Sequence, residues 1–164
     1  MLAAPGVFTI PPTGQGNAVL VFVDPADNTA KIAAPGSASL SIGFTTAPIP
    51  IGQTGFFYAT GLGSLISPVP DGTADSTTTH FATATPIVLV GGVPAQVQFA
   101  GQAPGFPGVN QINIAIPNSI PTGDAVPLQI QTADGQIIST PGATIAIRAA
   151  TTSAQSLPSG NPDR

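Results

Sequence analysis

Short apolar stretches recur along the whole chain, separated by clusters of Gly, Pro, Asn and Asp. In the second half the apolar residues alternate with other types: residues 111–116 read Gln-Ile-Asn-Ile-Ala-Ile, and residues 126–131 read Val-Pro-Leu-Gln-Ile-Gln. Successive side chains of a β-strand point to opposite faces, so a period of two gathers the apolar side chains on one face. The alternation predicts antiparallel strands with Ile114 and Ile130 in a core and Gln129 facing outward.

The first half contains apolar runs that do not alternate. Residues 18–23 read Ala-Val-Leu-Val-Phe-Val, a pattern typical of a strand buried on both faces. Residues 55–60, Gly-Phe-Phe-Tyr-Ala-Thr, predict a second strong strand, and residues 39–44 predict an alternating one. Residues 64–85 are polar, rich in Thr and interrupted by Pro, and they predict a long loop or a sheet edge.

The spacing of these elements predicts an all-β protein. Glu is missing, and Gly or Pro interrupts every stretch that could hold a helix. Several short strands separated by turn residues favour an immunoglobulin-like antiparallel β-sandwich with extra N-terminal strands. We expect an N-terminal strand-bearing extension over residues 1–44, packed on or donated to a sandwich over residues 45–149, and a polar tail over residues 150–164.

Charge is scarce throughout the chain. Only 6% of the residues are charged, against about a quarter in an ordinary soluble domain. Like-charge repulsion therefore does little to keep two copies apart, and an outside made of small polar residues is easily desolvated. This composition suits close packing against another protein surface, and it favours self-association as a homo-oligomer or homopolymer.

The same composition excludes several partners. With three Lys and Arg residues and a net charge of −4, the chain cannot neutralise a run of phosphates, so we expect no nucleic-acid binding. The longest apolar runs are too short to cross a bilayer as a helix, so we expect no membrane insertion. The absence of Cys excludes disulfides and thiolate metal sites. Residues 1–6 lack the basic and apolar regions of a signal peptide, which fits a mature chain or a piece of a longer protein.

His80 is the only histidine and the first candidate for catalysis. A Ser–His–Asp arrangement can be drawn from the residues present, but no Gly-x-Ser-x-Gly turn exposes a serine. Residues 61–64, Gly-Leu-Gly-Ser, are interpreted as an ordinary turn. Paired carboxylates for glycoside chemistry would have to come from Asp residues in turns. We therefore expect no enzymatic activity and no catalytic residue.

The acidic residues lie in turns. Asp24, Asp27 and Asn28 offer oxygen ligands for Ca²⁺, but their spacing is not that of an EF-hand, and an Asx turn is the favoured interpretation. The same holds for Asp71 and Asp75 on either side of a glycine. Residues 134–135, Asp-Gly, predict a hairpin turn. We expect no metal and no cofactor.

The aromatic residues are eight Phe and one Tyr, without Trp. Sugar-binding surfaces usually display Trp or Tyr, so a glycan partner ranks below self-association. Phe106 lies between two Pro-Gly turns and is predicted to be exposed as a protein contact. Four other Phe side chains are predicted to belong to the core: Phe22, Phe44, Phe57 and Phe99.

A short apolar strand near the N-terminus is a second candidate for assembly. Residues 7–10, Val-Phe-Thr-Ile, are bounded by prolines that prevent a long hairpin. Such a strand pairs with its own sheet or is donated to the edge of a neighbour's sheet. The candidate assembly contacts are therefore Val7, Phe8, Ile10 and Phe106.

Two stretches resemble known domains. Residues 52–63, Gly-Gln-Thr-Gly-Phe-Phe-Tyr-Ala-Thr-Gly-Leu-Gly, and residues 90–97, Val-Gly-Gly-Val-Pro-Ala-Gln-Val, resemble an IPT/TIG immunoglobulin-like domain. The chain is more similar to an uncharacterised C-terminal domain family of large secreted proteins of Acidobacteria. That likeness lies in residues 5–9 (Pro-Gly-Val-Phe-Thr), 58–63 (Tyr-Ala-Thr-Gly-Leu-Gly), 103–106 (Ala-Pro-Gly-Phe) and 111–113 (Gln-Ile-Asn). That resemblance spans residues 5–148, departs at Asn110, where the family usually has Tyr, and implies a secreted bacterial protein without an established activity.

These observations converge on one expectation. The chain is expected to be an extracellular or cell-surface structural subunit, not an enzyme, that assembles with copies of itself by sandwich packing or strand addition. A filament or a surface layer would be the product. The alternative is an adhesion or glycan-binding module of a larger secreted cell-surface protein.

Overall fold

The computed structural model describes residues 3–38, 40, 43–70, 72–73, 75–139 and 141–150. In this part of the chain every regular element is a strand, which confirms the all-β prediction. No helix that could cross a membrane occurs among these residues. The strands are β1 (Gly6–Val7), β2 (Thr9–Ile10), β3 (Gly16–Ala18), β4 (Leu20–Asp24), β5 (Thr29–Ala33), β6 (Thr46–Ala47), β7 (Ile49–Pro50), β8 (Thr54–Thr60), β9 (Ile87–Val90), β10 (Val93–Gln102), β11 (Asn110–Ala115), β12 (Gly123–Gln131) and β13 (Ala143–Arg148).

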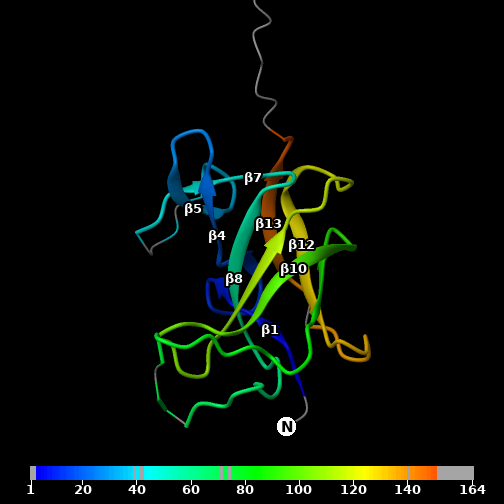
Figure 1. Cartoon of the computed structure of the whole chain (residues 1–164). Helices are drawn as coiled ribbons and strands as arrows, with labels where there is room; N and C mark the ends of the chain where they lie inside the picture. The colour runs from blue at the N-terminus through cyan, green and yellow to red at the C-terminus, as the bar shows by residue number, and fades with distance from the viewer. Residues whose placement is uncertain are drawn as a thin grey trace, which may run out of the picture.

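The strands form one curled sheet in the order β2-β3-β13-β12-β9-β10-β11-β8-β4-β5-β6, with β1 also paired to β8 and β7 to β13. In Figure 1, β4 and β5 lie on one side of β8, and β10, β12 and β13 lie on the other. The long strand β10 joins the two halves of the curl, because residues 93–95 pair with β9 while residues 96–102 pair with β11. The immunoglobulin-like sandwich stays a prediction, since the pairing runs through a single continuous sheet.

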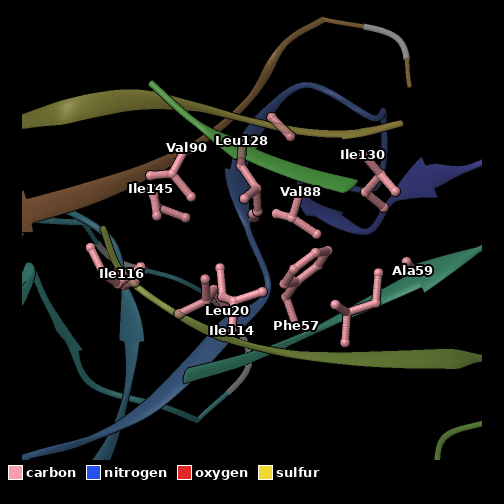
Figure 2. Close-up of a cluster of buried hydrophobic side chains, with 14 of the residues drawn as sticks. Leu20, Phe57, Ala59, Val88, Val90, Ile114, Ile116, Leu128, Ile130 and Ile145 are labelled. Atoms are coloured by element: carbon pink, nitrogen blue, oxygen red, sulfur yellow. The ribbon is translucent and has the colours of Figure 1, made fainter. Parts of the chain in front are cut away.

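The core lies inside the curl. Figure 2 shows Leu20, Phe57 and Ile114 of β4, β8 and β11 pointing toward side chains of β9, β12 and β13. All three are fully buried, as is Ile130 of β12. The predicted inward positions of Ile114 and Ile130 are therefore confirmed, and Gln129 is less buried than its neighbours.

Two of the aromatic residues assigned to the core lie elsewhere. Phe22 and Phe57 are buried as predicted, but the side chain of Phe44 is 46% exposed. Phe99 is half-buried and opposes Asn113 on the outer side of the sheet. Both assignments assumed that aromatic side chains are buried. The described residues do not cover the whole outer surface of this sheet, so aromatic side chains there stay in contact with solvent. Residues 39, 41 and 42 of the predicted strand at 39–44 lie outside the described residues.

The N-terminal strands join the sheet of their own chain. Val7 opposes Ala59 of β8, and the amide of Phe8 donates to the carbonyl oxygen of Tyr58 over 3.1 Å. After a cis peptide bond before Pro11, the chain returns through β3, which pairs with β2. Donation of this segment to a neighbour stays a prediction. The predicted tail lies outside the described residues from position 151 onward.

Candidate functional site on the outer face of the sheet

The outer side of β4 and β8 carries apolar side chains as well as the inner side. Because Leu20 and Phe57 point inward, alternation places Val21 of β4 and Phe56 of β8 outward. Phe56 lies between Val21 and Asn113 of β11 in the sheet register. Residues 20–23 of β4 are therefore apolar on both sides of the sheet, but only the inner side is covered by the described core, and Val23 remains 49% exposed.

These outward side chains line a groove of about 560 Å³. A second hollow of about 280 Å³ adjoins it and shares Val19, Tyr58 and Phe106 with it. None of the described residues that line either hollow is charged. We call this combined surface the aromatic face and define it by Phe8, Val19, Phe44, Phe56, Tyr58 and Phe106.

Tyr58 lies at the centre of the aromatic face. Its ring centroid is 5.8 Å from that of Phe56, with the rings nearly perpendicular, and 6.2 Å from that of Phe106. Phe106 reaches this position from a loop that closes on itself, because the amide of Ala103 donates to the carbonyl oxygen of Val109 over 2.8 Å. Phe106 is nevertheless 54% exposed, and Tyr58 is itself only half-buried.

The structure brings together two of the four predicted assembly contacts. Phe8, which is 40% exposed, lines the same hollow as Phe106. Val7 instead packs against the core, and Ile10 is half-buried opposite Asn17. Sequence reasoning missed Phe56 and Tyr58, although three consecutive aromatic residues in one strand require at least one of them to face outward.

His80 is placed between two acceptors. Its Nδ1 lies 2.7 Å from the carbonyl oxygen of Ser67, and its Nε2 lies 3.0 Å from Oδ2 of Asp75. Carbonyl and carboxylate oxygens only accept, so both contacts are hydrogen bonds when each ring nitrogen carries a proton. The hydrogen bond to Asp75, and then that to Ser67, raise the pKa of His80. A ring protonated on both nitrogens has no lone pair with which to accept a proton.

Asp24 binds two of the three cations of the chain. Nζ of Lys31 lies 3.0 Å from Oδ2 of Asp24 and 2.7 Å from Oδ2 of Asp27, and Nη2 of Arg148 lies 2.9 Å from Oδ1 of Asp24. The amide of Ala26, followed by Lys31 and Arg148, lowers the pKa of Asp24. The lysine ammonium thus occupies the position between the two carboxylates that the calcium interpretation required.

The described residues contain no group of three or more His, Cys, Asp or Glu side chains that could hold a metal ion. Asp71 lies outside the described residues. Asp75 accepts hydrogen bonds from the amide and the hydroxyl of Thr77, each 2.7 Å long, as expected for an Asx turn. Asp134 accepts a hydrogen bond from the amide of Gln136 in the predicted turn at residues 134–135.

Comparisons with protein-family models, with curated proteins and with solved structures found no match. The resemblance to a secreted acidobacterial domain family therefore stays a prediction. Function is inferred from the geometry of the aromatic face and of the few charged residues.

Proposed function

We propose that this chain is an extracellular, non-enzymatic structural subunit that assembles with copies of itself through the aromatic face. The observation that carries the proposal is the exposure of Val23, Phe44 and Phe106, each about half exposed, around one uncharged groove. Contiguous apolar surface of this kind on a soluble protein marks an interaction site.

A second copy of the chain fits this surface better than a charged partner does. The described lining of the groove offers no charge to an acidic or basic partner, whereas a copy brings an equally uncharged apolar face. The two cations Lys31 and Arg148 are bound to Asp24, and neither of them lines the groove. The outer side of β4 is apolar, as is typical of a strand that is buried on both faces. A second sheet packed against this outer side would bury it.

Face packing is better supported than strand addition. The sheet order ends at β2 and β6, and each of these strands is two residues long. Short edge strands offer few main-chain groups to an added strand. Phe8 and Phe106 would then contribute to assembly through their side chains, in a filament or a surface layer.

A double variant tests the proposal. Phe8→Ser with Phe106→Ser removes two exposed rings from the aromatic face, while Ile138→Ser removes an exposed apolar side chain that lies outside it. Light scattering and negative-stain microscopy are expected to show assembly of the wild type and of Ile138→Ser, and monomers of the double variant with an unchanged circular dichroism spectrum. A wild type that stays monomeric at millimolar concentration in physiological salt, or a double variant that assembles equally well, would overturn the proposal.

One observation favours the second candidate, an adhesion or glycan-binding module. Gln111 opposes Tyr58 in the register, and its amide donates to Oδ1 of Asn113 over 2.8 Å. An aromatic ring beside a pair of amides is a combination that can stack on a sugar ring and bind its hydroxyls. A monodisperse monomer that binds a glycan array, and loses binding in Tyr58→Ala, would favour this function over self-assembly.

A further inference from the structure

A series of contacts connects His80 with Phe106. His80 is 8% exposed and joins two separate points of the loop between β8 and β9 through its ring, Ser67 and Asp75. Its carbonyl oxygen also accepts from the amide of Gln102 at the end of β10 over 2.9 Å. The loop is thereby held against the strand that leads into the Phe106 loop.

Asp75 extends this connection to the aromatic face. While its carboxylate binds His80, its carbonyl oxygen accepts from the amide of Gly105 over 3.2 Å. Gly105 directly precedes Phe106, whose ring lies on Tyr58. One residue thus contacts the histidine with its side chain and the Phe106 loop with its main chain.

The ring contacts require a proton on each nitrogen. A neutral imidazole has one N–H and one lone pair, so one of the two oxygens, at 2.7 Å and 3.0 Å, would then face a lone pair. Two acceptors at such distances repel each other, and one of the contacts must open. Deprotonation therefore loosens either Ser67 or Asp75 from the histidine.

We propose that His80 is a proton-operated clamp that holds Phe106 in the aromatic face, so that assembly through this face needs the protonated ring. The proposal rests on the proposed function. Asp75 is the one charged side chain that the described residues bring to His80, since the segments packed on it at Ser67 and residues 100–103 carry no charge. Asp71 lies outside the described residues.

The direction of the pH effect follows from the contacts. Asp75 and Ser67 raise the pKa of His80 above its ordinary value of 6.5. The clamp is therefore closed below about pH 6.5 and opens as the pH rises through the raised pKa. Assembly is expected to be strong at pH 6 and weak at pH 9.

The test compares the wild type with His80→Gln, which keeps a polar side chain but cannot titrate. Both chains are acetylated at the N-terminus, because an α-amino group titrates in the same range. We expect the protein concentration at which half of the wild type is assembled to rise about tenfold between pH 6 and pH 9. This is the change in affinity that the loss of one hydrogen bond of ordinary strength produces. His80→Gln should assemble weakly and equally at both pH values.

Nuclear magnetic resonance of the wild type gives a readout that needs no variant. Protonation of both His80 ring nitrogens at pH 6, and loss of the Phe106–Tyr58 ring contact on deprotonation, would support the clamp. Equal assembly at pH 6 and pH 9 would overturn the clamp and leave the proposed function intact. If the wild type is monomeric at both pH values the proposed function fails, and a Phe106–Tyr58 contact that persists at pH 9 would then overturn the clamp as well.

Discussion

Nη2 of Arg148 lies 2.9 Å from Oδ1 of Asp24, so an ion pair ties the end of β13 to the end of β4. The Asp24 side chain is 5% exposed, and Lys31 binds its other oxygen. The guanidinium also donates through Nε to the carbonyl oxygen of Pro48 over 3.0 Å. In a chain with so few charges, this network gathers strands that are distant in sequence at one end of the core.

Asp24→Asn is expected to destabilise the protein by about 2–3 kcal/mol. The change keeps the shape of the side chain but leaves two cations without their shared carboxylate, and breaking a buried pair typically costs about 3–5 kcal/mol. The expected cost is smaller because Arg148 is 33% exposed and reaches water. Chemical denaturation measures it, with Asp124→Asn at an exposed position as the control. Equal midpoints for the two variants would contradict the assigned role.

The same network predicts that stability falls in acid. The folded pKa of Asp24 is below its unfolded value of 3.8, and Lys31 lowers the pKa of Asp27 to about 2. A carboxyl group with a lowered pKa stabilises the fold above its unfolded pKa and loses that effect as the pH falls through the folded pKa. Melting temperatures of the wild type should therefore fall as the pH drops from about 5 to below 4, and the fall should be shallower in Asp24→Asn. Parallel profiles would show that Asp24 does not contribute.

The alternation in β12 predicts opposite effects for neighbouring residues. Ile130 is fully buried, so Ile130→Ala should cost about 2–5 kcal/mol through lost burial and the cavity left behind. Gln129 faces outward, so Gln129→Ala should cost less than about 0.5 kcal/mol. Urea unfolding of both variants measures the difference. Similar costs would mean that the strand is shifted by one residue in its register.

The inward positions could be predicted because alternation depends only on the geometry of a strand. Ile114 and Ile130 stand in segments where one face is apolar and the other polar, so the core face is evident. Phe44 and Phe99 also stand in segments that alternate, with Ser39 and Ser41 or Gln96 and Gln98 at the other positions. Phe99 was assigned wrongly because the register of β10 shifts between Val97 and Phe99, so that Val97 opposes Ile114 whereas Phe99 opposes Asn113. Alternation also cannot tell whether an apolar side chain such as Phe44 is covered by another part of the chain.

The contacts of the charged side chains could not be predicted from the sequence, for a different reason. Asp75 and His80 are close in sequence, but the carbonyl oxygen of Ser67 that completes the site comes from elsewhere in a long loop. Asp24 and Arg148 meet only because β4 and β13 face each other across the curled sheet. Which Asp residue each cation contacts therefore depends on the topology of the sheet.

Gly61 gives the last prediction, because the N-terminal strand passes directly against it. The amide of Ala4 donates to the carbonyl oxygen of Gly61 over 2.9 Å, and a Cβ at Gly61 would overlap the carbonyl oxygen of Ala4. Gly61→Ala should therefore push β1 away from β8 and speed hydrogen exchange at the amide of Phe8. Gly14→Ala is the matched control, because its φ of +76° is close to the +73° of Gly61 but nothing lies within 4 Å of its added Cβ.

Both substitutions place Ala in the left-handed region, at a cost of about 1–2 kcal/mol. The excess loss of stability in Gly61→Ala over Gly14→Ala therefore measures the packing of the N-terminal strand on its own sheet. If assembly uses side chains of the aromatic face, Gly61→Ala should also weaken assembly, because Phe8 follows β1 directly. Equal stability and equal exchange at Phe8 in the two variants would show that the strand is held elsewhere, as donation to a neighbour requires.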